Sequence, residues 1–535
     1  MRGIFIVAAL ALAPRVPRIR EADALAGQWR FTISAPERGE MVVRMRITEA
    51  QGGAWTAASR LGAARAFVPW WKYQLGRLTG KVPDGGSLVV LDAHVSGPGR
   101  FRGAFRSEMI GKYTVDGTVG KDRITGVFRR DSSGASVGTF FATRDAAAEP
   151  VRDYRSLART IADTLVGDVF DPRLARTEPW KTFLGAVARD MSRATDDLDA
   201  MAAFYSNLPG LGLSHVELVR DPVLARLPID SLTSRVWGPP DSLVRFQFIG
   251  PGVGYMLVRK WDAVTSAIDR AFRRLDSARA NALIIDLRGN PGGDNSAGAP
   301  LAHLFRDTTY AGVLLTNKWF SVHAAPPTVA ELSGTPLVTR DEGIEIVRAI
   351  RANGAVRAGA VPRAPYFAGK VYVLIDGRSA SASEPIAHHL RSTGRATLIG
   401  QRTAGAMLMH LPHDLGDGWV LLVPEADFYA ANGARLEGHG VMPDIVTPSR
   451  EALVVAAREI AKADAHAGAV VESIALVSLG RWMASVDAYR RAITTRPEPN
   501  IRATLERTIK RRLGQAPDDK DAKAALEALT AVRDH

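Results

Sequence analysis

Two segments of this chain each join an apolar strand to a sharp polar turn, and they constrain the fold more than any other feature. Residues 282–294 read ALIIDLRGNPGGD, and residues 371–405 read VYVLIDGRSASASEPIAHHLRSTGRATLIGQRTAG. Short apolar runs of this kind are typical of the buried strands of an α/β domain. Two such junctions in one domain can place backbone N–H donors beside a hydroxyl nucleophile, which is the minimum apparatus for acyl transfer.

The second junction carries three serines, Ser379, Ser381 and Ser383, and Glu384 follows them. A serine between a strand and a helix is exposed, and the next backbone N–H can point to the same oxyanion. The helix N-terminus adds a potential that favours negative charge. The competing interpretation is an ordinary N-cap followed by a capping carboxylate, and the local sequence leaves both interpretations open.

The first junction carries Gly289, Gly292 and Gly293. Glycines allow the backbone to approach a ligand closely, although a simple tight turn would use them too. The segment does not match a phosphate-binding loop, because no Gly-Lys-Ser/Thr sequence follows it.

Composition excludes several classes of protein. The chain has 535 residues, of which 46% are hydrophobic and 23% charged, so it is not a disordered chain. The net charge is +13, but the basic residues are scattered and not interleaved with aromatic residues. We therefore expect no nucleic-acid partner. The chain has no cysteine, which excludes disulfides, a thiol nucleophile and cysteine-based metal sites.

Two histidine pairs are candidate metal ligands, and we expect neither to bind a metal. His410 and His413 could meet on one face of a helix, but Pro412 would disrupt that helix. The other candidate is the adjacent pair His388 and His389. The sequence therefore predicts no metal and no organic cofactor.

The N-terminus resembles an export signal. Residues 4–13 form an apolar run of ten residues after Arg2, which is too short to span a bilayer but suits a signal-peptide core. Small-residue cleavage patterns occur at 11–13 and 22–24, and Pro14 disfavours the first. An ordinary N-terminal strand or a misplaced start codon is the alternative. We expect a signal peptide at 1–24, an exported protein of bacterial type, periplasmic or secreted, and no stable membrane insertion of the mature chain.

The organisation along the chain predicts a multidomain protein. Residues 25–148 alternate apolar and polar positions between Gly-, Asp- and Ser-containing turns, which predicts an antiparallel β sheet or small barrel. Strands are expected at 29–33, 41–47, 87–91, 101–105, 113–119, 123–128 and 139–143. The aromatic cluster at 69–73 could line a ligand or peptide site, or pack in the core.

The rest of the chain changes pattern twice. Residues 149–225 show helical spacing, at 154–166 and again at 180–205. Residues 226–450 alternate strand and helix signals, which predicts an α/β core. Residues 451–535 are helical, and 480–497 resemble the second half of a tetratricopeptide repeat, a weak indication of a partner site.

Three motifs, in this order, resemble the signatures of the S41 peptidases, the C-terminal-processing and tricorn-like serine peptidases. DLRGNPGG occupies 286–293, SASE occupies 381–384 ahead of GRA, Gly400 and TAG, and EGHGVMPD occupies 437–444. The resemblance spans roughly residues 150 to 450 and leaves both ends of the chain unexplained. It implies a crotonase-like α/β core of the ClpP/crotonase type and a serine endopeptidase that acts on polypeptides through an acyl-enzyme.

The resemblance also implies roles for individual residues. Ser381 would be the nucleophile, with Ser379 and Ser383 as local alternatives. The backbone N–H of Ala382, together with that of Gly292 or Gly293, would form the oxyanion hole.

The general base departs from one branch of the family. The processing peptidases use a lysine just after the TxG motif, but this position is Ala406, and no lysine occurs between 371 and 461. The tricorn-like branch uses a histidine within a Ser-His dipeptide, which matches Ser214 and His215 here. This resemblance implies that His215 is the base and that Ser214 and Glu437 orient it. A structural or surface imidazole is the competing interpretation of His215.

A second departure concerns substrate capture. Most relatives carry a PDZ domain between the helical segment and the core, but only about forty residues separate His215 from the strand at 254–258, too few for such a domain. The N-terminal β domain or the C-terminal helices could take its place, and a homo-oligomer stays open.

Two other functions compete with the peptidase as interpretations of this sequence. The first is a binding protein on the same fold, like the retinoid-binding relatives, and the second is a thioester-handling member of the crotonase-like architecture. The complete set of Ser381, His215, Ser214 and Glu437 favours the peptidase, because a pure binder has no need of it.

Overall fold

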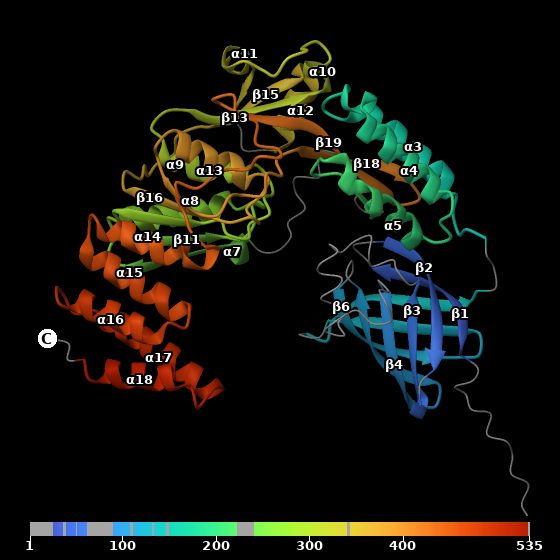
Figure 1. The fold of residues 1–535 in the computed structure, drawn as a ribbon, viewed down its shortest axis with the longest axis horizontal. Helices are drawn as coiled ribbons and strands as arrows, with labels where there is room; N and C mark the ends of the chain where they lie inside the picture. The colour runs from blue at the N-terminus through green and yellow to red at the C-terminus, as the bar shows by residue number, and fades with distance from the viewer. Residues whose placement is uncertain are drawn as a thin grey trace, which may run out of the picture.

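The computed structural model describes residues 25–35, 39–49, 51–60, 89–107, 111–130, 133–145, 149–221, 240–339 and 343–532. The barrel and the C-terminal helices lie at the two ends of an arch, and the α/β part forms its middle (Figure 1). The expected signal peptide at 1–24 and the aromatic cluster at 69–73 lie outside the described residues. No helix within these ranges is long and apolar enough to cross a membrane.

Eight antiparallel strands form a closed barrel, in which each strand pairs with the next and β8 pairs with β1. The strands are β1 (Gly27–Ala35), β2 (Gly39–Glu49), β3 (Ala54–Ser59), β4 (Val89–Gly97), β5 (Arg100–Ser107), β6 (Gly111–Val119), β7 (Arg123–Arg129) and β8 (Ser136–Arg144). Alternate side chains fill the interior, where the Trp55 and Phe101 rings lie 5.0 Å apart. The predicted antiparallel β fold is confirmed, although β3 was not predicted.

Three helices follow the barrel: α3 (Tyr154–Asp168), α4 (Glu178–Met191) and α5 (Asp197–Asn207). The helical spacing at 180–205 corresponds to two helices, because the chain leaves the helix at 192–196. The Asp196 side chain accepts a hydrogen bond from the Asp199 N–H and so caps a new helix.

The barrel is joined to α5 by two buried carboxylates. Because β3 pairs with β2 only from Met45 onward, the first half of β2 has backbone N–H groups left over. Val42 donates to Asp197 (2.8 Å) and Arg44 donates to Asp196 (2.7 Å). Asp197 also lies 3.5 Å from the guanidinium of Arg220, beyond the segment that carries Ser214 and His215. The barrel and that segment are therefore fixed to the same helix.

The α/β part contains two sheets. The first has the order β10-β11-β12-β16-β17-β20, with β10 antiparallel to β11 and the other neighbours parallel. Its strands are β10 (Val244–Gly250), β11 (Val253–Val258), β12 (Ala282–Asp286), β16 (Lys370–Ile375), β17 (Thr397–Gly400) and β20 (Ile445–Val446). The second has the order β14-β15-β13-β19-β18, and β9 pairs with β19 as well. Its strands are β9 (Glu217–Arg220), β13 (Thr309–Thr316), β14 (Leu337–Val338), β15 (Ala355–Ala360), β18 (Met409–Gly416) and β19 (Trp419–Ala430).

The first sheet is buried on both faces, which explains its continuous apolar strands. On β12, Leu283 and Ile285 face α8 (Thr265–Ser277) and α13 (Ser383–Ser392), and the second sheet packs on the same core. Ala282 and Ile284 face the opposite way, against α14 (Ala452–Ala461) and α15 (Ala465–Ser478). The predicted alternation of strands and helices is confirmed for this part of the chain.

The C-terminal end continues as α16 (Trp482–Ile493), α17 (Pro499–Gln515) and α18 (Lys520–Thr530). Gly480, with φ 71°, follows the end of α15, where a left-handed residue is usual. The segment that resembles half of a tetratricopeptide repeat thus corresponds to α16 and its flanking turns. Whether it binds a partner stays a prediction.

Candidate active site

The two strand-to-turn junctions lie side by side. Strands β12 and β16 are parallel neighbours in register, with Asp286 opposite Leu374, so both strands end at the same edge of the sheet. Open α/β sheets bind their ligands at this edge. The glycine-rich turn after β12 and the serine cluster after β16 therefore form one site.

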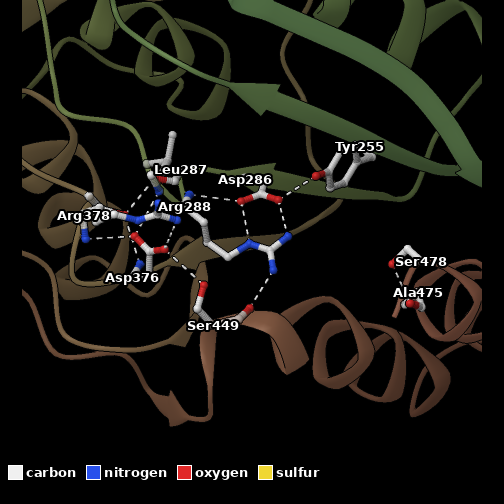
Figure 2. Close-up of polar contacts among 11 residues, drawn as sticks. Tyr255, Asp286, Leu287, Arg288, Asp376, Arg378, Ser449, Ala475 and Ser478 are labelled. Carbon is white, nitrogen blue, oxygen red and sulfur yellow. Dashed lines mark hydrogen bonds and ion pairs between the residues drawn. The ribbon is translucent and has the colours of Figure 1, made fainter. Parts of the chain in front are cut away.

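Figure 2 shows the polar network that holds both turns from below. The Asp286 carboxylate accepts from the Arg288 Nε (2.9 Å), and the same guanidinium donates to the Ser449 carbonyl (2.6 Å). Asp376 accepts from the Gly289 N–H (3.0 Å) and from the Ser449 hydroxyl (3.1 Å). Each carboxylate has several donors, so the two turns are fixed to each other and to the segment before α14.

The three serines of the cluster have different surroundings. Ser379 and Ser383 are fully buried. The Ser379 hydroxyl donates to the Leu287 carbonyl (2.7 Å), and the Ser383 hydroxyl accepts from the Trp261 indole N–H (2.9 Å). Ser381 is only half-buried, and its hydroxyl has no hydrogen-bond partner in the described ranges. Of the three hydroxyls, that of Ser381 is the one that is free to react.

The backbone of Ser381 is strained, with φ 51°. A positive φ costs a non-glycine residue about 1–3 kcal/mol and persists only where the surroundings impose it. The Ser381 N–H donates to the Ala406 carbonyl (2.8 Å) and to Glu384 (3.2 Å). The buried Glu384 carboxylate also accepts from the N–H groups of Gly405 (2.8 Å) and Ala406 (2.9 Å), and from the hydroxyl of Thr403. Burial raises the pKa of Glu384, although these donors oppose the rise.

The glycine turn lies directly against the serine cluster. A Cβ on Gly292, which has φ 103°, would lie 2.5 Å from the Ser381 Cβ and 3.0 Å from the Ala382 nitrogen. The Gly292 N–H is already used, because it donates to the Asn290 side chain (2.9 Å). The N–H groups of Gly293 and Ala382 have no acceptor among the described residues. One of these unpaired N–H groups directly follows Ser381 in the chain, and the other directly follows Gly292, which packs against Ser381.

Replacing Gly292 by alanine should remove at least about 99% of kcat/KM, because displacing the reacting groups by about 1 Å costs roughly 100-fold. The added Cβ would displace Ser381, and the alanine would also have to adopt the strained backbone angle φ 103°. Gly377→Ala is the matched control, because its new Cβ would lie 3.8 Å from the nearest atom, the Arg402 carbonyl oxygen. Full activity in Gly292→Ala would contradict this close packing.

The predicted base lies in a hydrogen-bonded chain with its predicted partners. The Ser214 hydroxyl donates to Glu437 (2.8 Å), and the Ser214 N–H donates to the other oxygen of that carboxylate (2.9 Å). The same hydroxyl lies 2.6 Å from the His215 Nδ1. Because a serine hydroxyl has a single hydrogen, it accepts the Nδ1–H of His215. The Nε2 of His215 is then left with a free lone pair.

Glu437 also connects this chain to the loop that supports the nucleophile. It accepts from the Met407 N–H (2.6 Å), and Met407 follows Ala406, whose carbonyl accepts from the Ser381 N–H. Within the described chain, no hydrogen bond joins the Ser381 hydroxyl to the His215 ring. The structure therefore brings Ser214, His215 and Glu437 into contact, and places Ser381 on the neighbouring loop.

Burial lowers the pKa of His215 to about 4, which keeps the imidazole neutral. A second imidazole packs against it: the ring centroids of His215 and His410 lie 5.1 Å apart. The pKa of His410 is also lowered to about 4, by burial and by the charge that His215 would carry. The His410 Nδ1 is buried without a hydrogen-bond partner. Sequence reasoning considered His410 only as a metal ligand and missed this contact.

The histidine pairs do not form metal sites in the described ranges. His410 and His413 lie on strand β18, not on a helix, so an odd spacing points them to opposite faces, and His413 pairs with Glu425 (2.8 Å). His389, in α13, hydrogen-bonds to Thr309. Among the residues that the structure describes, no group of three or more His, Asp or Glu side chains could hold a metal ion.

Comparison with known proteins identifies the class of this site. Residues 252–447, which contain both junctions, match the family model described as Peptidase family S41. The α/β core of this chain is therefore similar to peptidase family S41, as the motifs indicated.

The chain resembles several curated proteases over part of its length. It is 26% identical over 200 residues to the carboxyl-terminal-processing protease of Picosynechococcus sp., covering 37% of this chain and 40% of that protein. It is 27% identical over 252 residues to the protease of the same name from Synechocystis sp., covering 47% and 50%. A carboxy-terminal-processing protease of Bartonella bacilliformis is 40% identical over 76 residues, 14% of this chain and 18% of that protein. The aligned part thus spans half or less of each relative.

Solved structures of related proteases are similar at low scores. The photosystem II D1 C-terminal processing protease has a TM-score of 0.35 and 17% identity, over 56% of this chain and 94% of that chain. The tricorn protease has a TM-score of 0.34 and 12% identity, over 76% and 44%. The similarity to family S41 is seen in the sequence matches.

Proposed function

We propose that this protein is a serine endopeptidase that hydrolyses peptide bonds of proteins or peptides through an acyl-enzyme. Ser381 is the nucleophile and His215 the general base. The observation that carries the proposal is the arrangement around Ser381. It combines a free hydroxyl on a strained residue, the unpaired N–H groups of Ala382 and Gly293 on the two adjoining turns, and a half-buried neutral imidazole on the adjoining segment. The match of residues 252–447 to a peptidase family supports it.

In the acylation step, the Ser381 oxygen attacks the scissile carbonyl carbon while the His215 Nε2 takes the hydroxyl proton. The carbonyl π electrons move to its oxygen, and the N–H groups of Ala382 and Gly293 stabilise this oxyanion. Gly292, the alternative donor, serves the close packing instead, because its N–H is bonded to Asn290. The tetrahedral intermediate collapses, the C–N bond breaks, and the amine leaves with the proton from His215.

Deacylation repeats the sequence with water. His215 takes a proton from water, the hydroxide attacks the ester carbon, and Ser381 leaves with the proton returned by His215. Ser214 and Glu437 act as positioning residues, since they fix the tautomer and stabilise the imidazolium. No step requires a metal or an organic cofactor.

The proposal extends to the domain organisation, the location and the partner of the protein. The α/β core at 226–450 has a crotonase-like architecture, preceded by the β-rich domain at 25–148 and the helical part at 149–225, and followed by the helical region at 451–535. The apolar run within 1–24 supports export to the periplasm or beyond. The partner is a polypeptide substrate, with no nucleic acid involved.

Digestion of unfolded casein and a mixed peptide library by the wild-type protein, read by mass spectrometry, tests this function. New peptide termini that accumulate with time are the expected result. If neither substrate is cleaved, the peptidase proposal fails and the binding-protein alternative gains weight.

The pH dependence of kcat/KM should reflect the low pKa of His215. Because the pKa of His215 is about 4, this histidine stays neutral as the pH falls below 6.5, and it becomes protonated and inactive only near pH 4. At pH 5.5, kcat/KM should therefore stay within about twofold of its value at pH 7.5, whereas an unperturbed imidazole would lose about tenfold. Preincubation at each pH, followed by assay at pH 7.5, controls for unfolding. An acid limb centred near pH 6.5 would contradict this environment for His215.

A further inference from the structure

A small apolar cavity adjoins the nucleophile. Its volume is about 110 Å³, and it lies between α13, the second sheet and α12 (Gly343–Asn353). Most of its lining is apolar, and the polar side chains are those of Asp294 and Asn295 on one side. The large apolar side chains are those of Leu301, Leu314, Ile346, Ile386, Met407 and Phe428. A cavity with such walls favours an apolar occupant, since a polar group would lose its hydration there without gaining a partner.

The one charged residue in the lining, Asp294, already accepts three hydrogen bonds from the protein. The two oxygens of Asp294 accept from the N–H of Ser296 (2.9 Å) and the N–H of Ala263 (2.8 Å), and the Ser296 hydroxyl donates as well. This carboxylate therefore caps a turn and offers little to a basic side chain. Its oxygens therefore have fewer positions left for the ammonium of a lysine or the guanidinium of an arginine.

The position of the cavity connects it to the chemistry. Ala382, which lines it, follows Ser381 and carries one of the two unpaired N–H groups. Met407, on another side, follows Ala406, whose carbonyl holds the Ser381 N–H. The cavity thus touches both chain segments that flank the nucleophile. A scissile carbonyl that lies on Ser381 with its oxygen at the Ala382 N–H would place the side chain of the adjacent carbon on the side of Ala382, where the cavity lies.

We infer that this cavity binds the side chain of the residue before the scissile bond and selects an aliphatic residue between valine and methionine in size. The inference rests on the proposed peptidase function and adds its specificity. An apolar cavity of about 150 Å³ is large enough for benzene. At about 110 Å³, the cavity here accepts a three- or four-carbon side chain but excludes the benzyl group of phenylalanine and the indole of tryptophan.

Small residues on β13 and β15 leave this space open, and Ala358 determines which substrate side chain fits into it. Ala358 and Ala360 line the cavity and share a face of β15 with the buried Val356. The ring of Phe428 closes another side, and a Cβ on Gly312 would lie 2.4 Å from it, so the ring has no room to move in that direction. A larger side chain at position 358 would therefore occupy the space that the substrate needs.

The test measures cleavage of a peptide series that varies only the residue before one scissile bond, with alanine, valine, leucine, methionine, phenylalanine, lysine and glutamate. For the wild-type protein we expect leucine, valine and methionine to exceed phenylalanine, lysine and glutamate by at least about tenfold in kcat/KM. A preference for aromatic or charged residues would overturn the cavity assignment and leave the peptidase function intact. No cleavage of any peptide would overturn the peptidase function, and the assignment with it.

Two variants test the determinant itself. Ala358→Leu should lower the ratio of leucine to alanine cleavage by at least about tenfold. The ratio is measured within one variant, so partial unfolding does not affect it. Ala352→Leu, at an exposed position of α12, is the matched control and should keep the wild-type ratio. Phe428→Leu should raise cleavage after phenylalanine relative to leucine. Unchanged ratios in both Ala358→Leu and Phe428→Leu would overturn the assignment.

Discussion

Replacing Ser381 by alanine should lower kcat by roughly 10⁴- to 10⁶-fold, the loss expected when a serine nucleophile is removed. The fold should survive, because the Ser381 hydroxyl has no partner among the described residues and alanine meets the same backbone strain at φ 51°. Peptide release gives the rate, and thermal unfolding followed by circular dichroism gives the stability. The melting temperature should stay close to that of the wild type.

The neighbouring serines provide the controls for this substitution. Ser379→Ala removes two buried hydrogen bonds, one donated to the Leu287 carbonyl and one accepted from the Asp376 N–H. Ser383→Ala removes the one accepted from the Trp261 indole. Each should destabilise the protein by about 1–3 kcal/mol and retain measurable turnover. If Ser381→Ala kept the wild-type rate while one of the other variants lost all activity in a folded protein, the nucleophile would be misassigned.

Replacing His215 by alanine should reduce kcat by about 10⁴-fold or more, because the proposed acceptor of the serine proton is lost. Without His215, hydroxide from the solvent has to take the serine proton, so the residual rate should rise with pH. Steady-state rates between pH 6 and pH 9 measure both effects.

His410→Phe is the matched control for the loss of the ring. It keeps an aromatic side chain against His215, 5.1 Å away in the native pair, and removes only the second imidazole. It should keep its rate within about tenfold of the wild type, because His410 packs against the base and does not touch the reacting atoms. A wild-type rate in His215→Ala, or a complete loss in a folded His410→Phe, would show that the two histidines had been assigned the wrong way round.

The candidate site could be predicted from sequence only as far as its motifs extend. Ser214 and Glu437 are 223 residues apart in sequence, and only their resemblance to family motifs brought them together before the structure did. The choice among the three serines depends on tertiary partners, Leu287 and Trp261, that no local pattern indicates. The same holds for Gly292, whose N–H is taken by the Asn290 side chain.

His410 illustrates why a contact can be missed entirely. In the sequence it is a lone histidine near Pro412, and the helix considered there does not exist, because the segment is strand β18. Pairing of β18 with β19, and of β19 with β9, brings it to His215. Such long-range pairing leaves no signal in a window of ten residues.

The strands of the fold were likewise predictable only where their sequence signal is local. The barrel strands were predicted because the alternation of buried and exposed positions is local, as in GEMVVRMRITE of β2. Strands β3 and β15, AWTAAS and AVRAGA, were not predicted, because alanine and glycine have low strand propensity and their conformation is imposed by neighbouring strands. The alanines of β15 that weaken its strand signal are also those that leave room for the cavity beside Ala382.

Covalent labelling with a fluorophosphonate probe, followed by peptide mapping, tests the central claim most directly. The probe reacts with an activated serine hydroxyl, so the account predicts a single label on Ser381 that disappears in Ser381→Ala and is strongly reduced in His215→Ala. A label on Ser379 or Ser383, or a protein that cleaves peptides but takes no label at any serine, would contradict it.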